Sequence, residues 1–383
     1  MKVEQIVVRD ASGAAAALQA LSGWGAQWVL AFGAIAPLKA LAEPLREAFP
    51  DAIRVGCSTA GEISNEGVTD NTCVVTAIRL DGSHLIEAST VLSHMEDSHA
   101  AGIRLSQQLP RDGLRAVLVL GQGVAINGSA LIEGMSSVLG ADVPITGGLA
   151  GDAAAFSETW VLSRDGVSAD RIVAVGLYGD ALRFSHGSFG GWSPFGPARR
   201  VTRSVNNVLY ELDGEPALEV YKRYLGDHAK DLPASGLLFP FAMLGRDHNE
   251  IGLIRTILGI DEAAGSLTLA GEIDPDGYLK LMHANTNALV GGAEAAAQAA
   301  LDMHRHGAAG DASQGLAVLV SCVGRKIVMG GRVDEEVEAV ADVFGQGAVI
   351  TGFYSNGEIS PFTGNLTCKL HNQTMTITYL TEA

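Results

Sequence analysis

Two short segments, one near each end of the chain, place side chains that could do chemistry beside tight glycine turns. Residues 56–64 read GCSTAGEIS and residues 352–360 read GFYSNGEIS. Cys57 could act as a nucleophile with Glu62 nearby, in acyl or amide chemistry, if a cation or a helix terminus favoured its thiolate. The matching position in the second segment is Phe353, so an apolar side chain is accepted there. We therefore favour a small buried hydrophobe over a catalytic thiol at Cys57.

Each segment also carries a glutamate directly after its second glycine, at Glu62 and Glu358. A carboxylate at a glycine turn can accept hydrogen bonds from its own loop, or it can bind an amine of a ligand. Both interpretations stay open. In VPITGGLAGD, a weaker third copy of the motif, Asp152 stands where the glutamates stand, and we count Ser58 and Ser355 with these carboxylates as candidate ligand contacts.

The elements that must position these residues repeat as well. Each motif is preceded by an apolar strand, a polar loop with glycine and an amphipathic segment, and the strands are WVLAF from Trp28, AVLVL from Ala116 and LAVLV from Leu316. Apolar strands that alternate with helical periodicity are typical of βαβ units. We predict an α/β protein of two related modules, built from repeated βαβ units with β-hairpins.

Three glycines mark the ends of strands in this repeat. Gly56, Gly147 and Gly352 each close an apolar run before a polar loop. We predict that they occupy equivalent positions, where backbone angles or close approaches exclude a side chain. The same comparison pairs the Thr-Cys dipeptide at residues 72–73 with that at residues 367–368.

The length of 383 residues suits two domains that fold without metals or disulfides. Gly and Pro cluster in SFGGWSPFGPARR, residues 188–200, which predicts a boundary there. The expected modules are therefore residues 1–190 and 191–383. Turns at residues 213–214 and 276–277, both Asp-Gly, predict hairpins in the second module.

Composition excludes several classes of function. The net charge of −17 disfavours nucleic acid and anionic membranes as general partners. The four cysteines have no CxxC spacing, which argues against a zinc site or a disulfide framework. No apolar run is long enough to span a bilayer, and the first residues lack the pattern of a signal peptide, so we expect a soluble cytoplasmic protein.

Three further side chains near the motifs are candidate ligand contacts. Arg325, after the third apolar strand, could bind an anionic group of a ligand or form a salt bridge with Glu358 or Glu62. Trp192 and Tyr354 could form aromatic walls of a pocket. Aromatic residues near Gly-Pro loops are more often packing anchors.

Together these motifs resemble the FIST proteins, which join a FIST N and a FIST C domain. The resemblance extends from about residue 25 to the end and rests on VGCSTAGEI, GGLAGD, GGWSPFGP, VLYELDGEPALEVYKRYLG, SCVGRK, GFYSNGEISP and LHNQTMTITYL. It implies a bacterial sensory protein with a FIST N-like module at 1–190 and a FIST C-like module at 191–383, which binds a small ligand and signals to partners. One departure is Asn356, where the family pattern has tyrosine.

One branch of that family is similar to haem-binding sensors of nitric oxide, which makes haem b a candidate cofactor. Noncovalent haem needs an axial ligand, commonly histidine, in an apolar pocket, and the chain has no CxxCH motif. Four histidines lie in or beside strands of the matched regions: His186, His248, His283 and His371. For each of them an ordinary histidine with satisfied hydrogen bonds is the competing interpretation.

Three classes of function stay open at this point. The first is a sensor of haem and nitric oxide, or of an amino acid or similar metabolite, that regulates a sensor histidine kinase or a cyclic-di-GMP enzyme, as the resemblance implies. The second is a hydrolase or transferase that depends on Cys57, although no base lies at a recognisable spacing. The third is a scaffold that forms a homo-oligomer. We favour the ligand-binding sensor over the enzyme.

Overall fold

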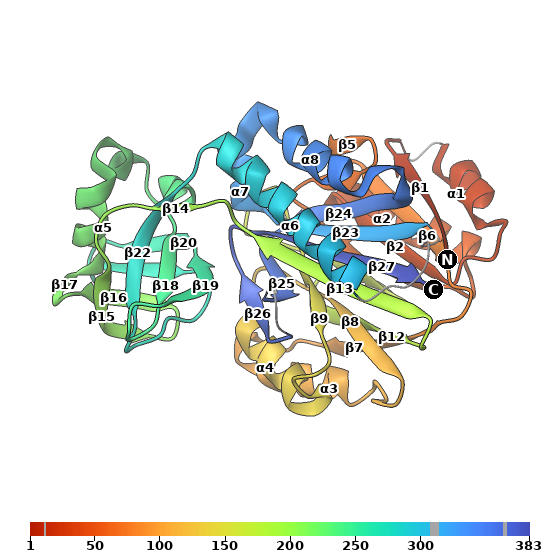
Figure 1. Ribbon diagram of the computed structural model, residues 1–383, viewed down its shortest axis with the longest axis horizontal. Coiled ribbons are helices and arrows are strands. Elements are labelled where there is room, and N and C mark those ends of the chain that lie inside the picture. The colour runs from red at the N-terminus through yellow and green to blue at the C-terminus, as the bar shows by residue number, and fades with distance from the viewer. Residues whose placement is uncertain (11–12, 307–313, 363–365) are drawn as a thin grey trace.

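Three mixed sheets, in which equivalent strands follow one another in the same order, form the core of the protein (Figure 1). The computed structural model describes residues 1–10, 13–306, 314–362 and 366–383. Sheet A runs β1 (Lys2–Val8), β6 (Cys73–Arg79), β2 (Trp28–Gly33), β3 (Ile53–Ser58), β10 (Val161–Ser163), β11 (Gly166–Ser168). Sheet B runs β13 (Leu182–Phe189), β27 (Met375–Glu382), β23 (Gly315–Cys322), β24 (Ala348–Ser355), β4 (Glu62–Ser64), β5 (Gly67–Thr69). Sheet C runs β7 (His84–Val91), β12 (Arg171–Tyr178), β8 (Leu114–Gly121), β9 (Ile145–Leu149), β25 (Gly357–Pro361), β26 (Cys368–His371).

Each sheet is completed by a hairpin from another repeat unit. In all three sheets the third and fourth strands are parallel, and they belong to one βαβ unit. The hairpin β4–β5 of the first unit joins sheet B, β10–β11 of the second joins sheet A, and β25–β26 of the third joins sheet C. The three units therefore interlock in a ring. The predicted α/β class and its repeated βαβ units are confirmed, and the weak third motif marks a complete unit.

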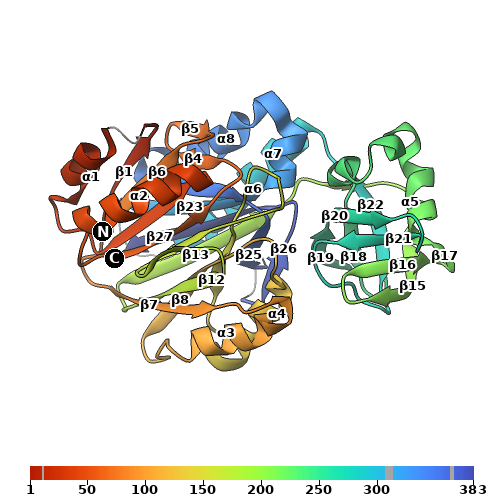
Figure 2. The same ribbon diagram turned by 180° about the vertical axis from the view of Figure 1, so that it is seen from behind.

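Apolar residues on the inner faces of the three sheets meet in one central core, and helices cover the outer faces (Figures 1 and 2). Separate apolar clusters lie under the helices of each sheet. These helices are α1 (Ala14–Ser22) and α2 (Ile35–Ala48) on sheet A, α3 (Ser98–Ser106) and α4 (Gly128–Leu139) on sheet C, and α6 (Thr286–His306) and α8 (Asp334–Phe344) on sheet B. A shorter helix, α7 (Val323–Met329), directly follows β23. No helix in the described ranges has both the length and the apolar character to cross a membrane.

The three repeat glycines occupy equivalent positions, as predicted. Gly56, Gly147 and Gly352 each pair in register with the adjacent parallel strand. An added Cβ would lie 1.8 to 1.9 Å from the carbonyl oxygen of Ala31, Val119 or Leu319. Two of the glycines also have positive φ, +127° at Gly147 and +157° at Gly352. No other residue type fits these sites without moving the neighbouring backbone.

A smaller domain is inserted between β13 and α6 and stands apart from the core in both views (Figures 1 and 2). It has its own apolar cluster around a mostly antiparallel sheet. Its strands are β14 (Ser193–Pro194), β15 (Arg199–Val205), β16 (Val208–Leu212), β17 (Glu215–Pro216), β18 (Phe241–Leu244), β19 (Glu250–Arg255), β20 (Ile257–Asp261), β21 (Ser266–Leu269) and β22 (Tyr278–His283). Its helical segments are α5 (Ala217–Leu225), η3 (Gly226–Asp231) and η4 (Ala234–Leu238).

The chain leaves the core for this domain near residue 190, where the sequence predicts a boundary. Strands on the two sides of that point still share a sheet, because β13 pairs with β27 along its whole length. The core is therefore made of residues from both expected modules.

Candidate functional site

Glu62 and Glu358 each bind their own loop. The Glu62 carboxylate accepts hydrogen bonds from the Thr59 hydroxyl at 2.5 Å, the Thr72 amide at 3.1 Å and the Thr72 hydroxyl at 2.8 Å. Glu358 accepts from the Ser355 hydroxyl at 3.1 Å and from the amide and hydroxyl of one threonine, Thr374, at 3.1 and 2.8 Å. Both side chains are almost completely buried. Of the two interpretations, the geometry favours the carboxylate that locks its loop.

These contacts correct two motif alignments made from the sequence. Thr374 makes the same bonds as Thr72, so Thr374 is its equivalent rather than the Thr-Cys dipeptide at residues 367–368. Val161 of the second unit pairs with Cys57, the residue after Gly56. Glu62 pairs in the same way with the residue after Gly352, and Glu358 with the residue after Gly147. Val161, and not Asp152, therefore occupies the glutamate position.

Asp152 stabilises a loop that only the second unit has. Its carboxylate accepts hydrogen bonds from the amides of Phe156, Ser157 and Glu158 at 2.7 to 3.1 Å. This loop separates β9 from β10 and explains why the short motif aligned at the wrong residue.

Cys57 lies in the central apolar core and is completely buried. Burial raises the pKa of its thiol well above the ordinary value, which disfavours the thiolate. The adjacent Ser58 hydroxyl donates to the Gly151 carbonyl at 2.7 Å and accepts from the Trp160 amide at 2.9 Å. Neither side chain faces a cavity in the described structure.

Arg325 and Tyr354 belong to one buried polar network. The Arg325 guanidinium donates to the Glu336 carboxylate at 2.7 and 3.1 Å, and the Tyr354 hydroxyl donates to the same carboxylate at 2.6 Å. Of the expected partners, neither Glu62 nor Glu358 pairs with Arg325; its carboxylate partner is Glu336. The network satisfies both side chains without a ligand.

Trp192 fixes the first connection to the inserted domain. Its indole N–H donates to the Gln373 carbonyl at 2.8 Å, and the residue is half-buried. It therefore acts as a packing anchor at this point rather than as the wall of a cavity.

The four candidate haem ligands divide into two groups. His186 and His371 are almost fully buried between sheets, and burial lowers the pKa of each to about 4. His371 shares a hydrogen bond between Nε2 and the Ser360 carbonyl at 3.0 Å. His248 and His283 are exposed on the inserted domain, where they contact Tyr278 and Phe195.

None of the four histidines lines any of the five main cavities among the described residues. Within the same residues, no group of three or more His, Cys, Asp or Glu side chains could hold a metal ion. Haem requires an imidazole that faces an apolar pocket, and none of the five main cavities presents one of these four histidines.

A cleft lies between the core and the inserted domain. Two adjoining cavities of about 650 and 130 Å³ lie there, and both are lined by Glu272 and Leu370. Asn127 of the core donates to Glu272 of the inserted domain at 3.3 Å, so a hydrogen bond links the two sides of the cleft. Clefts of this size at domain junctions are common ligand sites.

Asn356 and Asn372 line the smaller cavity, and each has a buried side-chain oxygen without a hydrogen-bond partner. Nδ2 of Asn356 donates to the Gly123 carbonyl at 3.2 Å, which fixes the amide and leaves Oδ1 without a partner. Asn372 is 2% exposed, and its Oδ1 is also buried without a partner. Buried acceptors without partners are rare in folded proteins, and they are typical of sites completed by a ligand or by water.

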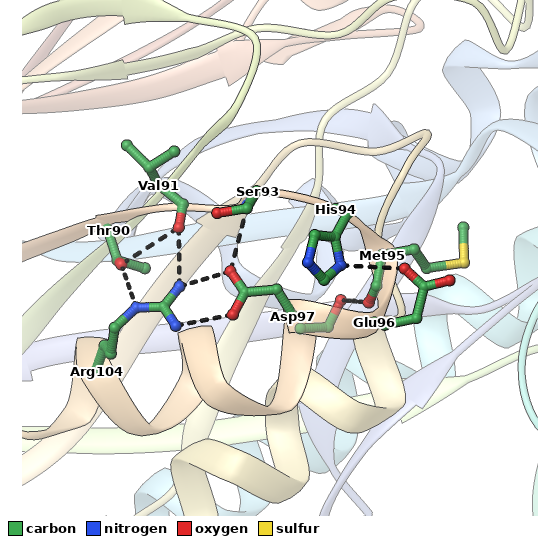
Figure 3. A network of polar contacts seen from close by, with 9 residues as sticks. Thr90, Val91, Ser93, His94, Met95, Glu96, Asp97 and Arg104 are labelled. Carbon is green, nitrogen blue, oxygen red and sulfur yellow. Dashed lines mark hydrogen bonds and ion pairs between the residues drawn. The ribbon is translucent and has the colours of Figure 1, made fainter.

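One rim of this cavity is a rigid loop that carries Met95 (Figure 3). The guanidinium of Arg104 binds the Asp97 carboxylate at 2.7 and 2.8 Å, and Asp97 also accepts from the Ser93 amide at 3.2 Å. The short helix η2 (Met95–Asp97) is thereby fixed, with the Met95 side chain directed away from the polar network. Met95 and, on the opposite rim, Leu258 are nearly half exposed.

Most of this cleft could not be predicted from the sequence. Arg255, at the end of β19, is buried and lines the larger cavity, and Asn372 lines the smaller one. Asn356 drew attention only as a departure from a family pattern. The dipeptides Asn71-Thr72 and Gln373-Thr374 are equivalent, and Asn71 and Gln373 share the rare positive φ of 60° and 62°. In the sequence, the amide residue before each threonine could have indicated this equivalence.

The fold defines an α/β protein with an inserted domain and a cleft between the two parts. The FIST N domain model matches residues 27–215 and the FIST C domain model matches residues 217–361. The chain therefore belongs to the FIST family, whose domains are sensory, ligand-binding signalling domains.

Two other comparisons are much weaker. An uncharacterized protein of Methanocaldococcus jannaschii is 35% identical over 88 residues, which cover 23% of this chain and 17% of that protein. A cyanuric acid hydrolase from A. caulinodans is 11% identical and covers 100% of this chain and 98% of its own, with a TM-score of 0.38. A second cyanuric acid hydrolase structure is 12% identical over 100% and 99% of the two chains, with a TM-score of 0.32. Likeness at this level carries no inference about activity.

Proposed function

We propose that this protein is a sensor that binds a small metabolite in the cleft between its core and its inserted domain, and that the bound state is passed to a signalling partner. The observation that carries the proposal is a pair of buried acceptors without partners, Asn356 Oδ1 and Asn372 Oδ1, on two residues that line one cavity. A ligand with an N–H or O–H donor would satisfy both.

A metabolite without haem is the better-supported ligand. The candidate histidines are either enclosed in the core or exposed on the inserted domain, and none faces the cleft. The departure at Asn356 lies on the cavity itself, and a tyrosine there would occupy part of its volume. Asn356 is thus placed to influence which ligand is accepted.

The test compares ligand binding by the wild type with binding by a variant in which the rim of the cavity is blocked. Thermal-shift screening of the full chain against amino acids, organic acids, nucleosides and sugars, followed by calorimetry, should identify ligands of the wild type. Met95→Trp combined with Leu258→Trp should narrow the cavity rim and weaken binding about tenfold or more. Val205→Trp is the matched control, because Val205 is also an exposed apolar residue but lines neither cavity of the cleft. Equal affinity in the blocked variant and the control would refute the cleft as the site.

Haem is tested separately. Reconstitution of the purified protein with haem should give no histidine-dependent Soret band. A Soret band that disappears in His186→Ala or His371→Ala would overturn this expectation.

A sensor histidine kinase or a cyclic-di-GMP enzyme remains our proposed partner, on the family resemblance alone. Either would be recognised by a change in its activity when the ligand-saturated protein is added. The alternative of an enzyme that uses Cys57 has little support, since the thiol is enclosed and no base contacts it in the described structure.

A further inference from the structure

Arg255 is a buried cation at the cleft that forms no salt bridge among the described residues, although the charge of Glu272 is near enough to act on it. The side chain is 3% exposed. Its Nε donates to the Glu272 carbonyl at 3.0 Å, and its Nη1 donates to the carbonyls of Ile254 and Leu370 at 3.1 and 3.4 Å. All three acceptors are neutral, and Nη2 makes no hydrogen bond within the described structure.

Burial of such a group is costly unless a negative charge compensates it. The cost is visible in the pKa of Arg255, which burial lowers to about 10. Two other buried arginines show the usual solutions. Arg325 pairs with Glu336, and Arg54 binds the carbonyls of Phe49, Pro50 and Ala52 after helix α2.

Arg255 differs from both because it lines a cavity of about 650 Å³. Helix α4 lies along the same cavity from Ser129 to Gly140, so its two termini contribute opposite partial charges and the potential at this position comes mainly from Arg255 itself. The position therefore combines a preformed guanidinium fork with open space in front of it, the usual arrangement for binding an oxyanion.

The surroundings limit the charge of that anion. Three carboxylates line the cavity, at Glu133, Glu272 and Asp274, and they are partly or fully solvent-exposed, as is Lys369. Exposed charges are screened by water and salt, so they weaken the attraction of Arg255 for one negative charge only slightly. A ligand with several negative charges would meet repulsion from all three, which disfavours nucleotides and other polyanions.

We propose that Arg255 binds the carboxylate of a small organic acid in this cleft. The inference deepens the proposed function, on which it rests, by naming the charge and the anchoring group of the ligand. It commits the protein to a monoanionic ligand, with the guanidinium forming two hydrogen bonds to one carboxylate group.

The test uses the simplest carboxylate and its neutral analogue. Acetate should raise the melting temperature of the full chain in a saturable way at constant ionic strength, and acetamide should not. Arg255→Gln should abolish the acetate effect, while Arg255→Lys, which keeps the charge without the fork, should retain it with an affinity lower by about tenfold. The matched control is Arg246→Gln, since Arg246 lies in the same domain but is exposed and pairs with Asp276.

The outcomes separate this inference from the proposed function. An acetate effect of equal size in the wild type and in Arg255→Gln would be a general salt effect and would overturn the inference. The inference would also be overturned by a metabolite that binds the cleft, loses affinity in the double variant Met95→Trp and Leu258→Trp, and keeps its affinity in Arg255→Gln. In that case the proposed function would still hold, but the ligand would not be anchored by a carboxylate. If Arg255→Gln does not fold, the comparison of acetate with acetamide on Arg255→Lys decides the question.

Discussion

The Arg325 guanidinium lies 2.7 Å from the Glu336 carboxylate, and both side chains are completely buried. The same guanidinium donates to the carbonyls of Gly190 and Leu289, which lie just before and just after the inserted domain. Arg325 thus holds both connections of that domain at the end of sheet B. Through Glu336 it also contacts Tyr354, two residues before Asn356 in the cleft. Contacts therefore run without a break from Asn356 in the cleft, through Tyr354, Glu336 and Arg325, to the base of the inserted domain.

Removal of Arg325 should cost a large part of the stability of the core. In Arg325→Met the Glu336 carboxylate would stay buried without its cation, so we expect the free energy of unfolding to fall by about 3–5 kcal/mol in urea denaturation. Arg332→Met is the control, because Arg332 pairs with Glu335 on the solvent-exposed surface, and it should cost less than about 1 kcal/mol. Similar losses in both variants would mean that the buried pair is not a main support of the two connections.

The repeat glycines should be intolerant of even one methyl group. In Gly352→Ala the new Cβ would lie 1.9 Å from the Leu319 carbonyl oxygen, and the backbone has a φ of +157°. We expect a loss of about 3 kcal/mol or more, or no soluble protein, because the neighbouring strand must move. Gly347→Ala is the control, since an added Cβ there meets no atom within 4 Å, and it should change stability by less than about 0.5 kcal/mol. Comparable stability of the two variants would contradict the role assigned to the repeat glycines.

How much of this was visible in the sequence depends on the range of the interactions. Apolar periodicity and the repeat glycines are local features, so the βαβ units and the equivalence of Gly56, Gly147 and Gly352 could be predicted. The units differ in loop length, and Asp152 lies in a loop that the other units lack. Asp152 was therefore aligned wrongly with Glu62 and Glu358. The cleft could not be predicted, since Arg255 meets Leu370 across 115 positions of sequence and Arg255 lies in the inserted domain, outside the repeated units.

The exchange of hairpins among units was equally hidden. Pairing of β4 with β24 joins residues almost 300 positions apart, and nothing in the composition of either strand specifies its partner. A motif found at both ends of the chain indicated duplication, but not that the copies would complete one another's sheets.

Stability should depend on pH through Glu358. Burial raises the pKa of Glu358 in the folded protein to about 7 from its ordinary value of 4.5. The folded state therefore keeps a proton that the unfolded state releases, and stability is lost as the pH rises from 4.5 through 7, by up to about 3 kcal/mol. Glu358→Gln should remove this slope from denaturation curves measured between pH 4.5 and 8.

Two other groups act in the opposite direction over part of this range. His186 and His371 have folded pKa values lowered to about 4 by burial, so stability is lost as the pH falls from 6.5 toward 4. The difference between wild type and Glu358→Gln isolates the carboxyl group from both histidines. Glu338→Gln, at an exposed position of α8, is the control and should keep the wild-type pH dependence. An unchanged slope in Glu358→Gln would show that the carboxylate is ionised throughout.

The native protein should be inert to thiol reagents. Cys57, Cys73, Cys322 and Cys368 are all buried, and burial raises the pKa of every one of these thiols, to about 12 for Cys368. Without thiolate and without access, reaction with a disulfide reagent should require unfolding, so that four thiols titrate in denaturant and none titrates in the first minutes under native conditions. Rapid labelling of one thiol in the native protein, lost in Cys57→Ser, would identify Cys57 as reactive and would restore the enzyme hypothesis.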